Sequence, residues 1–418
     1  MSTSLTAAQA GNTVTNFPVS KWRREDILAS LPAQAQALRA QALQRERERL
    51  LPYDALDAVR QSGLGALLVP REWGGPGGTL EDAALAILTL AEGDSNVPHA
   101  LRLHLNVAEL WRVLPPDEFL RQQIDRILAG KLFGGASTER DTAKPGIITT
   151  RLIREGDHWR LNGRKYYSTG TAFADYASIS AIDAQEQPVT VIIPTDREGL
   201  DVVEDWDGFG QRLTASGSLE LNNVLVHDEE VRPGSSLDLG LPSRHVSAWR
   251  QLILVATAGG IVRALLREIQ DYVHNKGRAA LHSSAETARE DPFVQHVIGD
   301  VAAHSHAIDV LVLDAARQLE RGAQAIRVKA ADVEAIVLQG GLATAKTQLV
   351  VSKLAQYAGQ QIFEAGGASA TSSTLLLDRH WRNLRTIFSH NPLNHKARVV
   401  GDWHLNGVTT QFERGRVF

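Results

Sequence analysis

The spacing of the hydrophobic residues changes twice along the chain, and this change constrains the fold more than any other feature of the sequence. From Arg24 to about Gly130 the apolar residues recur at helical spacing. Between Ile147 and Val231 they form short alternating or β-branched runs that are separated by turn residues. From Pro242 onward helical spacing returns, in stretches long enough for a four-helix bundle. The order helical, β, helical predicts an α+β fold in which a small antiparallel β domain, closed as a barrel or sandwich, lies between an N-terminal helical domain and a C-terminal four-helix bundle.

The same patterns predict the individual elements. In the first part the expected helices are Ile27–Leu51, Tyr53–Ser62, Glu81–Glu92, Pro98–Val113 and Asp117–Leu128. In the middle the expected strands are Ile147–Arg154, Trp159–Leu161, Tyr176–Ile182, Val189–Ile193, Gly217–Leu221 and Val224–His227. The expected bundle helices are Val246–Asn275, Pro292–Arg321, Ala331–Ala358 and a shorter one near Thr374–Thr386.

Domain boundaries are expected where the spacing changes, which gives an N-terminal helical domain at 24–130, a β domain at 131–237 and the bundle at 238–418. Residues 1–23 are expected to form a disordered lead, because Met1–Phe17 is polar and lacks the basic start and apolar core of a signal peptide. The longest apolar run, Leu252–Val262, is shorter than the roughly 20 residues that cross a membrane. We therefore expect a cytoplasmic protein that does not bind membranes.

Sulfur and charge exclude several classes of function. The 418 residues include no cysteine and only one methionine, Met1, which rules out disulfide scaffolds, thiolate metal sites, iron–sulfur clusters and cysteine nucleophiles. The 44 basic and 48 acidic residues give a net charge of −4 without a basic block, so nucleic-acid binding is not expected. The pair His304 and His306 lacks a third ligand at metal spacing, and no metal site is predicted.

Several motifs resemble the acyl-CoA dehydrogenase superfamily, and the resemblance runs over nearly the whole chain from about Arg24. The segments Gly63–Pro70, Gly134–Glu139 and Lys165–Gly170 are similar to segments that flank the flavin in that superfamily. Its dehydrogenases abstract a proton with a carboxylate placed late in the bundle or on its first long helix. Both places lack an acid here, because no Asp or Glu lies between residues 238 and 268 or between residues 378 and 402.

The segment from Asp378 to Lys396 instead resembles the flavin-dependent monooxygenase branch, which includes dibenzothiophene monooxygenase and sulfur-acquisition oxygenases. The resemblance implies a homotetrameric enzyme that takes reduced FMN, rather than FAD, from a separate NAD(P)H-dependent flavin reductase. It implies that O2 forms a C4a-(hydro)peroxyflavin, which transfers one oxygen atom to a small organosulfur substrate. Relatives also act on nitrogen and carbon, so the substrate itself is not predicted.

Two alternatives stay open. The first is an acyl-CoA dehydrogenase that uses FAD and a base not recognised in the sequence. The second is a flavin-binding protein without catalytic activity on the same fold, since fold does not determine function.

The resemblance also implies the site residues. His390 and His104 carry over as active-site histidines, whose ordinary pKa suits them to stabilise a peroxide or to transfer a proton, and Ser168 carries over as a hydroxyl near the flavin. Arg278 resembles the arginine that binds the flavin phosphate, and the bundle domain carries a tail that reaches the flavin. The predicted cofactor-binding residues are Ala136, Ser137, Thr138, Thr169, Trp206, Arg278 and Asn391.

Overall fold

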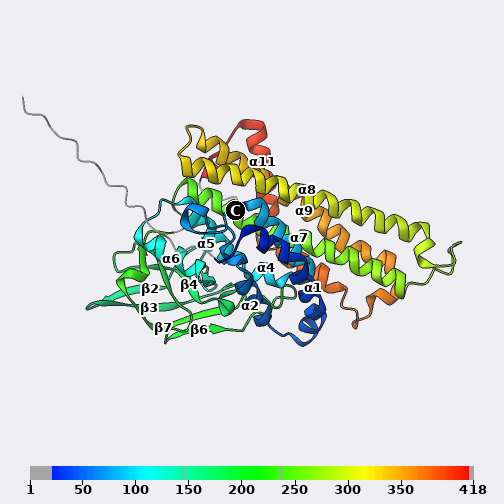
Figure 1. Cartoon of the computed structure of the whole chain (residues 1–418), viewed down its shortest axis with the longest axis horizontal. Helices are drawn as coiled ribbons and strands as arrows, with labels where there is room; N and C mark the ends of the chain where they lie inside the picture. The colour runs from blue at the N-terminus through cyan, green and yellow to red at the C-terminus, as the bar shows by residue number, and fades with distance from the viewer. Residues whose placement is uncertain (1–20, 145, 236–237, 414–418) are drawn as a thin grey trace, which may run out of the picture.

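The structure is a computed structural model that describes residues 21–144, 146–235 and 238–413. Figure 1 shows a β-sheet at one end of the molecule, three long helices lying side by side that extend away from it, and the N-terminal helices between the two. Of the disordered lead expected at 1–23, residues 1–20 lie outside the described residues. The predicted order of a helical part, a β part and a helical part is confirmed.

The N-terminal part is helical, as expected. Its helices are α1 (Arg24–Glu48), α2 (Tyr53–Ser62), α3 (Leu80–Gly93), α4 (Asn96–Ala100), α5 (Arg102–Val113) and α6 (Glu118–Leu128). Thr79 caps α3 through a reciprocal pair of hydrogen bonds with Asp82, which fixes where this helix starts. The single helix expected at Pro98–Val113 is interrupted at Leu101, so it forms α4 and α5 instead.

Eight strands form one sheet in the middle of the chain. They are β1 (Phe133–Ala136), β2 (Arg151–Glu155), β3 (His158–Lys165), β4 (Tyr176–Ile182), β5 (Pro188–Pro194), β6 (Leu200–Val203), β7 (Ser218–Val226) and β8 (Val231–Pro233). The strand order is β6-β7-β3-β2-β4-β5-β8, and β1 pairs with β4.

Three expectations about the sheet are corrected. Strand β1 runs parallel to β4, so the sheet is not purely antiparallel. The end strands β6 and β8 do not pair with each other within the described ranges, so the sheet is not a hydrogen-bonded barrel. The two strands expected at Gly217–Leu221 and Val224–His227 are one strand, β7, because Asn223 takes a left-handed conformation (φ 54°) and a shift in the β3 register lets pairing continue past it.

The C-terminal part contains the long helices α7 (Leu241–Asn275), α8 (Pro292–Val328) and α9 (Val333–Gly366), followed by α10 (Asp378–Ile387), α11 (Leu393–Asn406) and α12 (Thr410–Glu413). Helix α10 packs against α7 and α9, as the fourth member of the expected bundle. Helix α3 also lies close to α7, because Gly260 has no side chain and an added Cβ would lie 2.4 Å from Ala91. The domain boundaries expected after residues 130 and 237 fall between elements, and the division into domains stays a prediction.

The apolar run on α7 belongs to the protein core. Residues Leu252, Ile253 and Leu254 are completely buried in a cluster that spans α1, α3 and α7 to α10. No helix in the described part of the chain combines the length and the apolar character that crossing a membrane requires. A second cluster, which includes Trp111, Phe133 and Val246, joins α5, β1 and α7 at the place where the three parts of the chain meet.

A buried ionic network reinforces this junction. Glu109 on α5 is completely buried, 2.6 Å from Nε of Arg112 and 2.6 Å from Nε2 of His245 on α7. Arg112 also contacts Glu320 on α8 at 3.0 Å. Burial by itself would raise the pKa of Glu109, but the charge of Arg112 and the contact with His245 hold this pKa below its usual value. The network therefore connects α5 to two bundle helices.

Candidate functional site

A cavity of about 860 Å³, counted with the space open to solvent, lies where α5, α7 and the sheet meet. We call it the central cavity. Helix α5 supplies Leu103 and Asn106, the sheet supplies Ser137 and Ile192, and α7 supplies Arg250. The lining also includes the apolar residues Leu110, Trp111, Leu114 and Phe119, and Arg232 lies over the Phe119 ring at 5.4 Å. No carboxylate belongs to the described residues that line it.

A buried histidine, His99, lies on α4 and does not belong to the described lining of this cavity. Its Nδ1 is 2.8 Å from Oε1 of Gln211, which comes from the loop between β6 and β7. Because an amide oxygen can only accept, Nδ1 carries the proton and Nε2 of the neutral ring is left with a lone pair. Burial, reinforced by the charge of Arg102, lowers the pKa of His99 to about 3. His99 is therefore neutral at physiological pH.

Every polar group of Gln211, in the backbone and in the side chain, forms a hydrogen bond. Its backbone N–H donates to Oδ1 of Asn383 on α10 at 2.6 Å, and its side-chain Nε2 donates to Ser95 at 2.8 Å. Its carbonyl accepts from the indole of Trp206 and the hydroxyl of Thr214, both at 2.9 Å. These bonds hold Gln211 in a left-handed conformation (φ 50°) that is unusual for a residue other than glycine. The position of His99 is thus set by a rigid partner.

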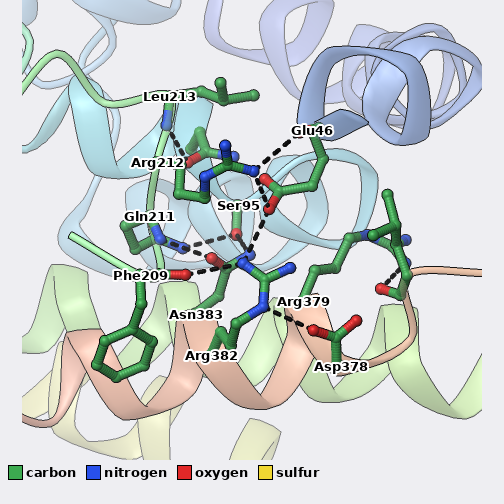
Figure 2. A network of polar contacts seen from close by, with 12 residues as sticks. Glu46, Ser95, Phe209, Gln211, Arg212, Leu213, Asp378, Arg379, Arg382 and Asn383 are labelled. Atoms are coloured by element: carbon green, nitrogen blue, oxygen red, sulfur yellow. Dashed lines mark hydrogen bonds and ion pairs between the residues drawn. The ribbon is translucent and has the colours of Figure 1, made fainter. Parts of the chain in front are cut away.

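Figure 2 shows how the rest of the loop is tied to α1 and α10. Glu46 of α1 contacts Arg212 of the loop at 3.2 Å and Arg382 of α10 at 3.0 Å. Arg382 also donates to the carbonyl of Phe209 at 2.8 Å. The Glu46 carboxylate is buried, so the positive charges of Arg212 and Arg382 compensate its negative charge in place of water. Three segments far apart in the sequence together position the residue that orients His99.

His390 lies in the turn between α10 and α11, and its Nδ1 is 3.0 Å from Oδ1 of Asn391. The ring is accessible to solvent, yet protein surrounds it on most sides. Burial and the charges of Arg102, His99 and Arg250 lower the pKa of His390 well below its ordinary value. The contact with the amide oxygen again assigns the proton to Nδ1. His390 and His99 are therefore two neutral imidazoles in one positively charged environment, each with a free Nε2.

His104 is engaged with backbone groups in the core, and its catalytic role stays a prediction. Its ring is buried, Nε2 is 2.9 Å from the carbonyl of Gly65, and Nδ1 accepts from the N–H of Phe133 at 3.1 Å. Burial lowers the pKa of His104 to about 4, so the neutral form that satisfies both partners is present. His104 joins α5 to β1 and to the turn after α2, which is a structural role.

Replacing His104 by alanine should therefore destabilise the protein without removing activity. Two buried backbone groups would lose their partners, and we expect a loss of about 2–4 kcal/mol in the free energy of unfolding. Turnover per folded molecule should stay within about threefold of the wild type, since His99 and His390 are unchanged. Urea denaturation and kcat of the purified variant measure the two effects, and a stable but inactive variant would contradict the structural role.

The predicted residues at the end of β3 are close together. Ser168 is completely buried, and its hydroxyl donates to the carbonyl of Gly217 at 2.8 Å. Thr169 contacts Ser216 at 2.8 Å, and Trp206 packs edge-on against Tyr167. Ser168 would have to give up its hydrogen bond to reach a flavin, and its catalytic role stays a prediction.

The predicted residues at the end of β1 differ in exposure. Ala136 is buried, whereas Ser137 and Thr138 are exposed. Ser137 lines the central cavity and accepts a hydrogen bond from Ser180 at 2.9 Å. Free hydroxyls and backbone groups of this kind suit the polar edge of a flavin ring.

Arg278 is separated from the other predicted residues. It is exposed and follows the end of α7 at Asn275. Arg250 lies on α7 25 residues before that end, which corresponds to roughly 40 Å along a helix at 1.5 Å per residue. Within one chain Arg278 therefore cannot contact a ligand in the central cavity.

Glu268, the first acidic residue along α7, forms ion pairs of its own. Glu268 pairs with Arg379 at 2.5 Å and with His380 at 3.0 Å. Burial would raise the pKa of Glu268, but His380 and Arg379 hold it far below the usual value, so this carboxylate is engaged and does not line the central cavity.

Sequence reasoning missed His99, Gln211, Arg102 and Arg250. A signal against a catalytic His104 was present, because His104 lies three residues after Leu101 and three before Val107, which is the helical spacing of a core position. No sequence signal indicates that Gln211 would face His99, since 112 residues separate them.

Comparisons with known proteins agree with this architecture. Residues 32–114, 135–224 and 252–395 match the N-terminal, middle and C-terminal domains of acyl-CoA dehydrogenases, in that order. The chain is 29% identical over 374 residues to the probable FMNH2-dependent monooxygenase SfnC of Pseudomonas putida, covering 87% of this chain and 91% of that protein.

Two solved structures are similar over most of their length. FMN-bound TdsC from Paenibacillus sp. A11-2 has a TM-score of 0.83 at 28% identity, over 91% of this chain and 98% of that one. The methanesulfinate monooxygenase MsuC from Pseudomonas fluorescens has a TM-score of 0.81 at 27% identity, over 91% and 97%.

Proposed function

Because the chain belongs to the acyl-CoA dehydrogenase superfamily, whose three domains it matches in order, we propose that it acts as a two-component monooxygenase that uses reduced FMN and O2. The proposed reaction inserts one oxygen atom into a small organosulfur compound. The relatives support this proposal, since they include an FMNH2-dependent monooxygenase, an FMN-bound structure and a methanesulfinate monooxygenase.

The observation that carries the proposal is the set of residues around the central cavity. Dehydrogenation of an acyl thioester requires a carboxylate base, and the described lining contains none. Two neutral histidines, His99 and His390, lie outside this lining, and their Nε2 atoms have no hydrogen-bond partner in the described ranges. The charge of Arg250, which does line the cavity, acts on His390. A neutral imidazole can accept a proton or a hydrogen bond from a peroxide, which suits oxygenation.

The residues around the cavity fit a flavin ring. Ser137 lines the cavity, whereas Thr138, Thr169 and Trp206 do not belong to its described lining. The hydroxyls of the three polar residues and the indole of Trp206 would have to contact the flavin ring from these positions. When bound, reduced FMN supplies the electrons that activate O2. The apolar residues of the lining would limit the contact between a bound flavin and water.

The proposal extends to partners and assembly. A separate NAD(P)H-dependent flavin reductase would supply the reduced FMN, and we propose the cytoplasm, where NAD(P)H is available, as the location. We also propose a homotetramer, because Arg278 could then reach the flavin phosphate of a neighbouring copy, which it cannot do within its own chain.

The test is a product analysis with ¹⁸O2, a flavin reductase, NADH and FMN, using aromatic sulfides, sulfoxides and sulfinates as substrates. One ¹⁸O atom should appear in the product, only when reduced FMN is supplied. Purified protein that is yellow with FAD and reduces a dye only with an acyl-CoA would point to a dehydrogenase. Flavin binding without oxygen incorporation from any substrate would point to a non-catalytic protein.

A further inference from the structure

Two arginines beside the central cavity lack an acidic partner. Arg102 is the first residue of α5, and Arg250 lies on α7 and lines the cavity. Neither forms a salt bridge with any carboxylate among residues 21–144, 146–235 and 238–413. One terminal nitrogen of Arg102 is completely buried without a hydrogen-bond partner. The segments outside these ranges contain no Asp or Glu.

The other arginines near this cavity are paired. Arg232, which also lines it, contacts Asp117 at 3.3 Å, and Arg112 contacts both Glu109 and Glu320. Arg102 and Arg250 therefore differ from Arg232 and Arg112 in having no acidic partner among the described residues. The fold supplies acids for arginines nearby and leaves these two without one.

Arg102 directly precedes Leu103, which lines the cavity, and its charge acts on both histidines. The charge of Arg250 acts on Arg102, and the charges of both act on His390. Burial and the neighbouring Arg250 lower the pKa of Arg102 to about 9, which leaves it charged at pH 7. Two like charges in a partly buried space are unfavourable unless an anion compensates them.

We propose that Arg102 and Arg250 bind the oxyanion of the substrate and that this substrate is an organic sulfinate. The two guanidinium groups would bind its two oxygens, and the organic group would contact the apolar lining residues Leu110, Trp111 and Phe119. This inference rests on the proposed function and names its substrate class. Arg102 and Arg250 would then determine specificity for an anion over a neutral sulfide.

A sulfinate suits both parts of the site. Its sulfur keeps a lone pair, which a sulfonate sulfur lacks, and its two oxygens share one negative charge. The reaction balances as R–SO2⁻ + O2 + FMNH2 → R–SO3⁻ + H2O + FMN. One oxygen atom forms a new bond to sulfur, the other leaves as water, and the flavin is oxidised by two electrons.

Benzenesulfinate and methyl phenyl sulfoxide provide a matched pair of probes. Both have an oxidisable sulfur lone pair and the same number of non-hydrogen atoms, but only the sulfinate is charged. Isothermal titration of the protein without flavin should show binding of benzenesulfinate at least tenfold tighter than of the sulfoxide. Arg102→Gln and Arg250→Gln should each weaken sulfinate binding by about 10- to 100-fold and change sulfoxide binding by less than twofold.

Controls separate charge from folding. Arg321→Gln removes an exposed arginine of α8 and should leave both affinities unchanged. Arg102→Lys and Arg250→Lys keep the charge and should restore part of the affinity. Because Arg102→Gln removes an uncompensated charge, its melting temperature without ligand should equal or exceed that of the wild type. A large drop in melting temperature would indicate a structural role and would count against the proposal.

The outcomes distinguish the anion site from the proposed function. Equal binding of the two probes would overturn the sulfinate proposal, even if FMNH2-dependent oxygenation of a neutral sulfide were observed. Weaker FMN binding by the Gln variants, with riboflavin binding unchanged, would assign the pair to the FMN phosphate and overturn it as well. Selective, arginine-dependent binding of benzenesulfinate without oxygenation would support the anion site and count against the monooxygenase function.

Discussion

Replacing His390 by alanine should reduce kcat for FMNH2-dependent oxygenation by about 100-fold or more, while FMN binding stays within about threefold of the wild type. The size follows from the usual contribution of a positioned proton-transfer group. His390 is accessible and its Nε2 is free, whereas its Nδ1 is committed to Asn391. Stopped-flow turnover and FMN titration measure the two quantities.

The pH profile tests the same assignment. Burial lowers the pKa of His99 to about 3 and, with nearby positive charges, lowers that of His390 well below its ordinary value. Both rings therefore take up a proton only well below the ordinary histidine pKa, and kcat should not decline through pH 6.5 as the pH is lowered.

His282→Ala provides the control, because His282 is an exposed histidine far along the chain from the site. It should leave kcat and FMN binding unchanged. Wild-type turnover in His390→Ala would remove His390 from the mechanism and leave His99 as the remaining histidine of the site. Loss of FMN binding together with turnover would indicate that His390 holds the cofactor rather than transferring a proton.

Replacing Glu109 by alanine should destabilise the protein by about 3–5 kcal/mol, because it leaves Arg112 and His245 without their buried partner. Removing one member of a buried ionic network leaves an uncompensated charge, which costs far more than the network itself contributes. The midpoint of urea denaturation should fall accordingly. Since Glu109 joins α5 to α7, the same variant should loosen the walls of the central cavity and weaken ligand binding.

Glu81→Ala is the matched control, since Glu81 pairs with Arg317 at 2.8 Å on the surface with both side chains exposed. It should cost less than about 1 kcal/mol, because water screens exposed pairs. Similar losses in the two variants would show that the Glu109 network contributes no more than a surface pair. The structure predicts that they differ severalfold.

The histidines show which residues of the candidate site could be predicted from the sequence. His390 was identified from the segment after Asp378, because the residues that mark it are close together in the chain. His104 was predicted from motif similarity and His99 was not considered, whereas the structure shows His104 bonded to Gly65 and Phe133 in the core. Motif similarity identifies a segment, but the partners of each histidine depend on how distant segments pack.

The sequence by itself determined the order of the elements and the absence of an acid at the expected positions of a dehydrogenase base. Both follow from local information: hydrophobic spacing sets helices and strands, and composition shows which side chains are missing. Only the tertiary structure decided which charges have partners. Arg102 and Arg250 look like any other arginines in the sequence, and their lack of a counter-ion becomes visible only when residues far apart in the chain are brought together. Electrostatic energy depends on distance in space, which the linear sequence does not contain.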